Sequence, residues 1–351
     1  MKKIDPKEFQ KALLNWYELN KKPLPWRETT EPYRIWLSEI MAQQTQVETV
    51  IPYYERFLKK YPTLIDLATA DDAELLKLWE GLGYYSRARN LKAGAQQIMA
   101  EFAGVFPTKL GDIRSIKGIG PYSAASIGSI CFGLAEPAID GNLFRVTSRL
   151  FELEADISRA SSRKIFDEKI RELISTESPG DFNQALMDIG ATICKPKSPR
   201  CEACPVQIYC AAYQHGSQEN YPVKSKKLKQ IPVYYQAFVL RNSLNQYLMA
   251  QRPAEGLLAS MWTFPMRQVE SEKAEVQVPT ELRDQIVKFT EIGQITHVFS
   301  HQKWYIRLFD CQLAVQGLQE ESGLYNQKWL SKKDLAQHAL AGPQIKMFKL
   351  L

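Results

Sequence analysis

The stretch that decides the fold is IKGIGPYSAASIG, which covers residues 116–128. Gly118 and Gly120 allow a tight turn between two helices, and Pro121 suits the first turn of the second helix. Backbone amides at the start of a helix form an anion site, for which a DNA phosphate is a natural occupant. On this stretch alone, a phosphate-binding hairpin and a plain helical hairpin are equally good interpretations.

Composition limits the classes of fold and function. The 351 residues predict two domains, at about 100–200 residues for each. A net charge of +6 suits a polyanionic partner such as nucleic acid, although many mildly basic proteins have the same charge. No apolar run approaches the ~18 residues needed to cross a membrane, and the start MKKIDPKEFQ is not a secretion signal. We therefore expect a cytoplasmic protein.

Residues 1–216 are expected to be mostly α-helical. Asp5 is a possible N-cap of a first helix over residues 5–20, with Pro6 at its first position. The other expected helices are separated by Gly, Pro, Asp or Ser and cover residues 32–47, 50–60, 71–80, 85–102, 121–132, 141–152, 161–175 and 181–193.

The composition changes after residue 216. Residues 217–232 are polar, basic and rich in proline at their ends, which is typical of a linker. The expected elements beyond it are strands at 233–241 and 246–252 joined by a short turn, an aromatic and β-branched stretch at 297–313, and helices near 279–290 and 331–339. The sequence thus predicts an α+β second domain over residues 233–351.

Two carboxyl residues stand at positions suited to chemistry. Asp140 precedes a predicted helix, where an ordinary N-cap is the favoured interpretation. Alternatively, the helix dipole keeps Asp140 ionised so that it stabilises a positively charged sugar. Glu39 lies in an apolar helix, where burial would raise its pKa and suit a general acid. The alternative for Glu39 is a place on a polar stripe with Ser38 and Gln43.

A buried acid and an ionised aspartate are together the pair that cleavage of a glycosidic bond requires. The acid protonates the leaving group, while the carboxylate supports the cationic sugar. Glu48 lies in a more polar setting and is the weaker candidate for the acid.

Four of the six cysteines lie in one short loop with the spacing C-x6-C-x2-C-x5-C. They are Cys194, Cys201, Cys204 and Cys210. Such clustering indicates a metal site rather than disulfides. Four thiolates suit either zinc or a 4Fe–4S cluster, and the spacing leaves zinc at least as good an interpretation.

Taken in order, these motifs resemble the bacterial adenine DNA glycosylases of the helix–hairpin–helix glycosylase superfamily. The resemblance covers about residues 10–215. Its matching stretches are LPWRETTEPYRIWLSEIMAQQTQVETVIPYYERF, WEGLGYYSRARNL, IKGIGPYSAASIG, AIDGN, FNQALMDIGATIC and the cysteine loop. It implies a mostly α N-terminal helix–hairpin–helix glycosylase whose loop over residues 194–210 holds a 4Fe–4S cluster rather than zinc.

The resemblance also implies roles for residues of the catalytic region. Glu39 would protonate adenine, and Asp140 would support or capture the sugar cation, with Tyr122 and Asn142 assisting them. The residues expected to line the adenine pocket are Trp26, Arg27 and Gln184. Those expected to fill the duplex or contact the opposite base are Gln44, Thr45, Leu82 and Tyr84. Core packing is the alternative for Leu82 and Tyr84.

Tyr122 occupies a position where related endonucleases carry a lysine that attacks the sugar and cuts the strand. A tyrosine cannot form a Schiff base, so the resemblance implies base removal without efficient strand cleavage. A thymine-specific branch of the superfamily also has tyrosine there, and Tyr122 therefore does not decide the base.

The segment 233–351 resembles a Nudix-like domain that recognises 8-oxoguanine opposite the adenine. The residues that match its lesion-reading loop are Phe299, Ser300 and His301, with His297 beside them. An exposed strand end is the alternative for these four. No carboxylate run of the Nudix pyrophosphatase type follows GLLASMWTFP, so nucleotide diphosphate hydrolysis is not expected.

The function implied is excision of adenine opposite 8-oxoguanine or guanine in double-stranded DNA, by a monomer associated with the bacterial nucleoid. Three alternatives remain at this point. One is a glycosylase for mismatched thymine or oxidised pyrimidines, which the residues after the linker disfavour. The others are a DNA-damage binding protein without activity, and a Nudix hydrolase.

Overall fold

The structure is a computed structural model that describes residues 4–225, 229–314 and 327–351. Contacts within the chain divide it into two compact units. Residues 1–70 and 89–226 form the first unit, and residues 71–88 and 227–351 form the second. No helix in the described ranges is long and apolar enough to span a membrane.

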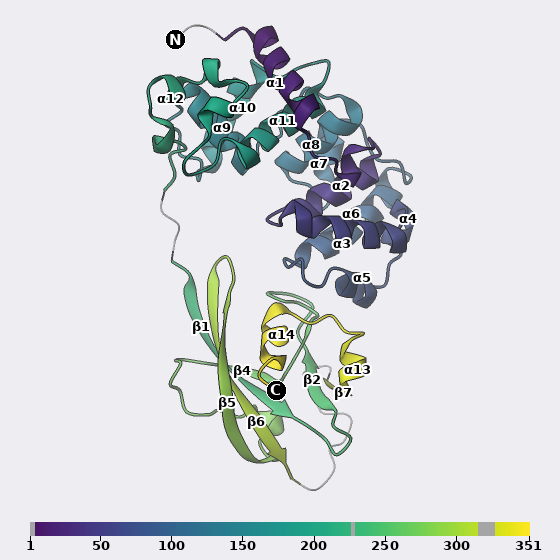
Figure 1. Cartoon of the computed structure of the whole chain (residues 1–351). Coiled ribbons are helices and arrows are strands. Elements are labelled where there is room, and N and C mark those ends of the chain that lie inside the picture. Colours follow the sequence, from purple (N-terminus) through teal and green to yellow (C-terminus); the bar gives the residue numbers. More distant parts are fainter. Residues whose placement is uncertain (1–3, 226–228, 315–326) are drawn as a thin grey trace. The chain divides into compact units, whose positions relative to one another are not determined.

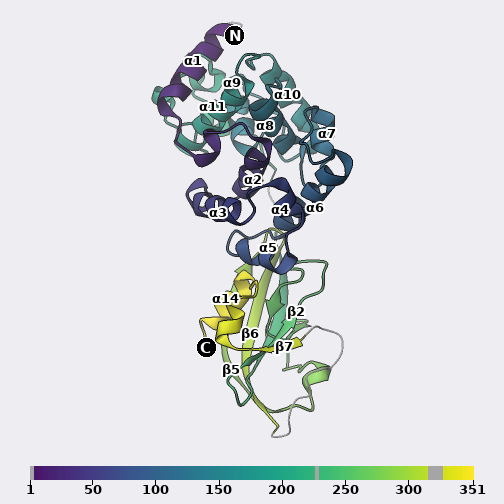
Figure 2. The same cartoon turned by 90° about the vertical axis from the view of Figure 1, so that its right-hand side faces the viewer.

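The helical part of the chain confirms the predicted mostly α region (Figures 1 and 2). Its helices are α1 (Pro6–Asn20), α2 (Pro32–Ala42), α3 (Val47–Lys60), α4 (Leu64–Ala68), α5 (Asp72–Leu78), α6 (Ser86–Glu101), α7 (Leu110–Ser115), α8 (Pro121–Phe132), α9 (Gly141–Phe151), α10 (Arg163–Arg171), α11 (Pro179–Thr192) and α12 (Ala211–Gln214). Asp5 caps α1 as predicted, because its Oδ1 accepts a hydrogen bond from the Lys7 amide at 2.9 Å. The core around α1, α9 and α11 is apolar and includes Phe9, Leu143 and Phe182.

Two neighbouring helices have different bounds from those expected. The sequence predicts helices over residues 32–47 and 50–60, but α2 already ends at Ala42 and α3 already begins at Val47. Gln44 adopts a left-handed backbone conformation with φ of 57°, which the helix cannot continue through. The break turns the chain sharply just after Glu39.

The second unit contains two sheets. The strands are β1 (Ile231–Leu240), β2 (Tyr247–Gln251), β3 (Trp262–Thr263), β4 (Met266–Val269), β5 (Ile286–Val298), β6 (Gln302–Leu313) and β7 (Gln327–Leu330). One sheet has the order β4-β1-β6-β5, with β1 and β6 parallel, and the other has the order β3-β2-β7. The side chains of Val239, Met249 and Ile306 join both sheets in one core. This confirms the predicted α+β class.

One expectation for this unit is wrong. Residues 279–290 do not form a helix: a short 3₁₀ turn, Thr280–Leu282, leads into strand β5. Residues 286–290 are a strand and not a helix because β5 pairs with β6 over the whole length of β5, for example at Phe289 and Cys311. The strands expected at 233–241 and 246–252 are present as β1 and β2, joined by the predicted short turn with one isolated antiparallel bridge between Arg241 and Tyr247, although they lie in different sheets.

The end of the chain is helical only in short pieces. The helix expected at 331–339 is the shorter α13 (Lys332–Leu335), and α14 (Gly342–Phe348) follows without having been predicted. Met347 of α14 is fully buried in the core that joins the two sheets. Thus α14 covers part of that core.

Candidate active site

A cavity of about 600 Å³ lies in the first unit, among α2, α8, α9, α11 and the chain before α2. Most of the predicted catalytic and base-pocket residues line it together. They are Trp26, Arg27, Glu39, Thr45, Tyr122, Asp140, Asn142 and Gln184. These residues come from segments far apart in the sequence, so the fold rather than local spacing assembles the site.

Glu39 lines the cavity with one carboxyl oxygen withdrawn from solvent. Its neighbours on α2 are buried and largely apolar: Ile35, Trp36, Leu37, Ser38 and Ile40. Glu39 Oε2 is buried without a hydrogen-bond partner among the described residues. Burial raises the pKa of this carboxyl, and the nearby Tyr122 and Ser126 hydroxyls oppose that rise only in part. Glu39 therefore favours the protonated form that a general acid needs.

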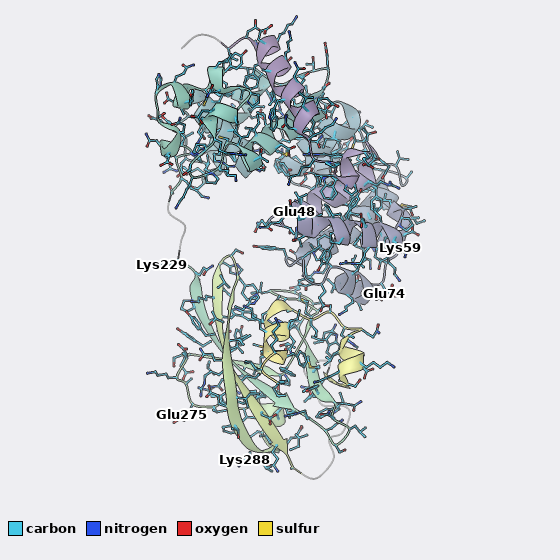
Figure 3. The ribbon with its side chains drawn as sticks, in the orientation of Figure 1. Glu48, Lys59, Glu74, Lys229, Glu275 and Lys288 are labelled. Carbon is cyan, nitrogen blue, oxygen red and sulfur yellow. The ribbon has the colours of Figure 1, made fainter. Side chains whose placement is uncertain are left out.

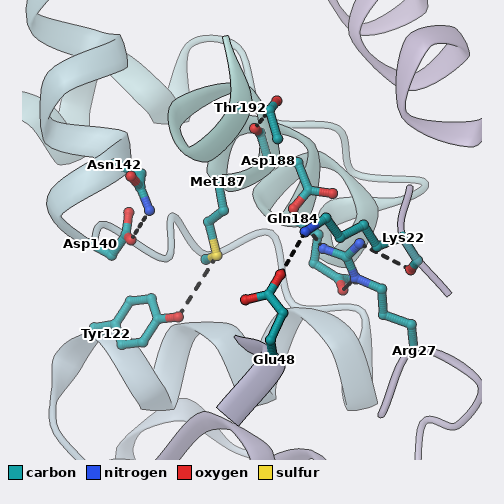
Figure 4. A network of polar contacts seen from close by, with 10 residues as sticks. All are labelled: Lys22, Arg27, Glu48, Tyr122, Asp140, Asn142, Gln184, Met187, Asp188 and Thr192. Carbon is teal, nitrogen blue, oxygen red and sulfur yellow. Dashed lines mark hydrogen bonds and ion pairs between the residues drawn. The ribbon is translucent and has the colours of Figure 1, made fainter. Parts of the chain in front are cut away.

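Glu48 shows the opposite behaviour on the neighbouring helix. It is exposed in the first turn of α3 (Figure 3). It forms an ion pair with Lys22, whose Nζ lies 3.0 Å from Glu48 Oε1 (Figure 4). Hydrogen bonding to its own backbone amide, and then to Lys22, lowers the pKa of Glu48. It stays ionised, which makes it a poor acid.

Asp140 is both a helix cap and a cavity residue. Its Oδ1 accepts a hydrogen bond from the Leu143 amide at 2.8 Å, which caps α9. Its Oδ2 accepts one from Asn142 Nδ2 at 2.9 Å. Burial nevertheless raises the pKa of Asp140 above its ordinary 3.8, against these hydrogen bonds and the charge of Arg145. The sequence analysis considered only the helix dipole as the cause that keeps Asp140 ionised. In the structure, hydrogen bonds and Arg145 also favour the ionised form, while burial opposes it.

Arg145 is a site residue that the sequence analysis missed. Its Nη2 donates to Asn142 Oδ1 at 2.9 Å and to the Gly190 carbonyl at 2.7 Å. Its Nε donates to the Cys194 carbonyl at 2.7 Å. The helices approach closely here, because a Cβ at Gly190 would lie 2.5 Å from Asn142 Cβ. Arg145 thus links the Asp140–Asn142 pair to the start of the cysteine loop.

Tyr122 lies in the first turn of α8, close enough to both Glu39 and Asp140 for their charges to affect its pKa. Its hydroxyl donates to Met187 Sδ at 3.7 Å (Figure 4). Burial, followed by the charges of Glu39 and Asp140, raises the pKa of Tyr122 well above its ordinary value. The hydroxyl therefore stays neutral, and the position offers no amine.

The base-pocket residues Arg27 and Gln184 are held by a further carboxylate. Arg27 Nε donates to Gln184 Oε1 at 3.1 Å, and Arg27 Nη2 pairs with Asp188 Oδ1 at 2.8 Å (Figure 4). Trp26 packs edge-on against Tyr54, with ring centroids 5.2 Å apart. Asp188 also lines the cavity and was not predicted. Its place four residues after Gln184, on the same helix face, is the only sequence signal for it.

The hairpin at residues 116–128 has the predicted form. Gly118 has φ of +84°, and a Cβ there would lie 2.7 Å from Asn90 Cβ. Gly120 is the N-cap of α8, and a Cβ there would meet nothing within 4 Å. Gly118 is thus required by the turn, while Gly120 leaves the start of α8 open to a ligand.

Two of the four loop cysteines contact Arg149, whose cationic side chain is buried. Arg149 is 2% exposed and donates from Nη1 to Cys194 Sγ at 3.3 Å, while Cys210 Sγ contacts the Arg149 carbonyl at 3.4 Å. Its other hydrogen bonds go to the backbone carbonyls of Lys195, Pro196, Gln218 and Tyr221. A buried guanidinium with carbonyl and sulfur partners fits a set of anionic thiolates.

The thiols influence one another as well. Burial raises the pKa of Cys204 to about 12, and the charges of the three other loop cysteines add to that rise. Within the described ranges, no three His, Cys, Asp or Glu side chains are arranged as a ready metal site.

The residues predicted to contact the opposite base differ in exposure. Gln44 is exposed after α2, Leu82 is buried, and Tyr84 is 48% exposed with φ of 46°. The packed side chain of Leu82 favours the core interpretation for that residue. Tyr84 is presented outward by a strained turn, which suits contact with a partner.

The four residues of the predicted lesion-reading loop lie at the turn between β5 and β6. Ser300 and His301 are exposed there. Phe299 packs between His297 and Trp304, with ring centroids 4.7 Å and 4.8 Å away. Burial lowers the pKa of His297, which keeps its ring neutral. Ser300 and His301 are therefore the outward-facing pair, and Phe299 and His297 hold the turn.

Comparison with known proteins agrees with both halves of this architecture. Residues 37–172 match the family described as HhH-GPD superfamily base excision DNA repair protein, and residues 236–350 match the NUDIX domain. The adenine DNA glycosylase of Rattus norvegicus is 33% identical over 412 residues, covering 99% of this chain and 78% of that protein. The chain belongs to the adenine DNA glycosylase family. It is a DNA N-glycosylase of base excision repair.

Other relatives give the same assignment to this glycosylase. The adenine DNA glycosylase of Buchnera aphidicola subsp. Baizongia pistaciae is 34% identical, covering 85% of this chain and 84% of that protein. The adenine DNA glycosylase of Arabidopsis thaliana is 35% identical, and the chain spans 58% of its length. A solved thermostable thymine-DNA glycosylase matches with a TM-score of 0.55 and 28% identity, covering 60% of this chain and 97% of that one.

Proposed function

We propose that this glycosylase removes adenine paired with 8-oxoguanine or guanine in double-stranded DNA. The observation that best supports this is the pair Glu39 and Asp140, two carboxyl groups in different environments on one cavity. Glycosidic-bond cleavage needs such a pair, because one group protonates the leaving base while the other stabilises the cationic sugar. In DNA, the leaving group is the base and the bond that breaks is the glycosidic bond between that base and its sugar.

In the proposed reaction, adenine is flipped out of the duplex into the cavity, beside Trp26, Arg27 and Gln184. Flipping costs a few kcal/mol, which a mismatched base lowers. Glu39 donates its proton to the adenine ring, so the base leaves as a neutral molecule. Asp140 stabilises the sugar cation until water adds, or captures it directly. Asn142 holds the Asp140 carboxylate in place, and Tyr122 stands as a neutral hydroxyl beside both groups.

Recognition of the opposite base is assigned to Gln44, Thr45 and Tyr84, with Ser300 and His301 reading 8-oxoguanine, while the buried Leu82 supports the turn that presents Tyr84. A serine hydroxyl and an imidazole both offer hydrogen bonds to the oxidised edge of that base. Phe299 and His297 support the turn that presents them. The turn at Gly118 and Gly120 holds a DNA phosphate without reading sequence. We propose that the enzyme works as a monomer on the bacterial nucleoid.

The enzyme should release adenine without cutting the strand, because Tyr122 offers no amine for a Schiff base. We expect single-turnover assays to give fast release at adenine opposite 8-oxoguanine, slower release opposite guanine, and strand breaks only after alkali. A thymine–guanine duplex is the matched control and should stay intact. Release of thymine in place of adenine would contradict the proposed substrate, and breaks without alkali would contradict the role of Tyr122.

We further propose that Cys194, Cys201, Cys204 and Cys210 hold a 4Fe–4S cluster. When bound, the cluster would supply a rigid structural centre for a loop that carries Lys195, Lys197 and Arg200, cations suited to contact DNA phosphate. Arg149 provides a buried positive charge against the thiolates.

Metal analysis tests the cluster directly. We expect the purified protein to contain iron and sulfide in the 4:4 ratio of such a cluster, and little zinc. Cys204→Ser should lose most of the iron, whereas Cys311→Ser, a cysteine of the second unit, should keep it. Stoichiometric zinc without sulfide would contradict the assignment.

A further inference from the structure

Asp188 is a carboxylate of the active-site cavity that the proposed reaction leaves without a role. It lies on α11, one turn after Gln184. The Asp188 and Arg27 side chains are largely withdrawn from solvent, at 21% and 12% exposed, and their atoms Oδ1 and Nη2 are 2.8 Å apart. A charge pair at this depth holds its partners in one geometry far better than an exposed pair does.

The contact between Arg27 and Gln184 has a direction. A guanidinium has hydrogen-bond donors and no acceptor, so only the carbonyl end of the Gln184 amide can face it. Arg27 Nε accordingly donates to Gln184 Oε1 at 3.1 Å. The amide NH2 of Gln184 is then the end left for a base in the cavity. An NH2 group pairs with a ring nitrogen of adenine, and the second lone pair of Oε1 can still accept from the adenine amino group.

Asp188 also neutralises the charge of Arg27 beside the base pocket, where an unpaired cation would slow the reaction. The reaction creates positive charge on adenine when Glu39 gives up its proton. An unpaired guanidinium beside the pocket would oppose that charge, because like charges a few ångströms apart repel in a partly dry site. By pairing with Arg27 Nη2, the Asp188 carboxylate offsets the repulsion between Arg27 and protonated adenine. Arg27 Nε still donates its hydrogen bond to Gln184 Oε1.

We propose that Asp188 is a positioning residue that holds Arg27, and through Arg27 orients the Gln184 amide for adenine. This inference rests on the proposed adenine chemistry of the same cavity. Asp188 touches neither the base nor the sugar in this account. It acts through two side chains that do line the base pocket, Arg27 and Gln184.

The first test is Asp188→Asn, which keeps the shape of the side chain and removes its charge. We expect the single-turnover rate constant of adenine release to fall about 10- to 100-fold, since misplaced binding groups cost about that much. The alkaline limb of its pH–rate profile should move to lower pH, because the unpaired Arg27 disfavours protonated adenine. Asp181→Asn, on an exposed residue of the same helix, should leave both unchanged. A drop in thermal stability with an unaltered rate and pH profile would make the role of Asp188 structural and overturn the proposal.

A double-mutant cycle tests whether Asp188 acts through Arg27. In an Arg27→Gln background, Asp188→Asn should cost little further activity, because the group that Asp188 holds is already gone. Losses that multiply independently would show that Asp188 acts by another route, and they would overturn the proposal.

A third measurement needs no catalysis. In ¹⁵N NMR spectra of the full chain, the Arg27 Nε–H signal should be protected from exchange with water in the wild type and lose protection in Asp188→Asn. The Asp181→Asn spectrum should match the wild type. If no adenine were released but this pattern held, the substrate assignment would fail and the orientation by Asp188 would stand. An unchanged Arg27 signal in Asp188→Asn would overturn the orientation itself.

Discussion

Replacing Glu39 by glutamine is expected to lower the rate constant of adenine release by about 100- to 10,000-fold, the range typical of a lost general acid. Glutamine matches glutamate in size but has no proton to give to the leaving base. Single-turnover assays on a duplex with adenine opposite 8-oxoguanine measure the loss. DNA binding should remain, because Glu39 lies on the cavity wall and not at the phosphate-binding turn.

Glu48→Gln is the matched control, since it makes the same change one helix later on an exposed glutamate. It should keep nearly full activity. Equal losses in both variants would show that the effect comes from general electrostatics, and undiminished release by Glu39→Gln would remove Glu39 from the mechanism.

The raised pKa of Glu39 also predicts a change in stability. A carboxyl whose pKa is higher in the folded state contributes stability at low pH and loses it as pH rises through that folded pKa. Glutamine does not titrate, so Glu39→Gln should be more stable than the wild type at about pH 8, with a smaller difference at about pH 5. Thermal unfolding at the two pH values measures this, and a gain confined to the acid side would contradict the burial argument.

Replacing Asp140 by asparagine should lower adenine release by at least about 100-fold, because a charge-stabilising group in the site is lost. The helix cap should survive, since asparagine also accepts the Leu143 amide hydrogen bond and is as good an N-cap as aspartate. Asn142 must reorient, because its Nδ2 now donates to Asp140 Oδ2 and would face an amide NH2 in the variant. Single-turnover kinetics and thermal unfolding on the same preparation separate the two roles.

Asp5→Asn provides the control, because Asp5 caps α1 in the same way but lies outside the cavity. It should change the free energy of unfolding by less than about 1 kcal/mol and leave the rate unchanged. If Asp140→Asn lowered the free energy of unfolding but left the rate constant of the folded protein unchanged, Asp140 would serve only as the N-cap of α9 and would have no catalytic role.

Local patterns in the sequence predict much of the site. The hairpin at 116–128, the cap at Asp140 and the apolar helix around Glu39 are each encoded within a few residues, and the structure has all three. The pairing of Arg27 with Asp188 could not be predicted in this way, since 161 residues separate them. It depends on how α11 packs beside the chain before α2.

The error at residues 279–290 has a similar cause. This stretch contains charged residues at spacings that suit a helix, but strand β6 offers a hydrogen-bonding edge along the whole of β5. Tertiary pairing outweighs local preference in such segments, because β propensity depends mostly on the neighbouring strand.

The most direct test of the central claim is the pH dependence of single-turnover adenine release, in the wild type and in Glu39→Gln. If Glu39 is the acid, the wild-type rate constant should fall as pH rises through its raised pKa, and the variant should lack this limb. A wild-type rate constant that stays flat or rises with pH, or a variant that keeps the same limb, would contradict the account.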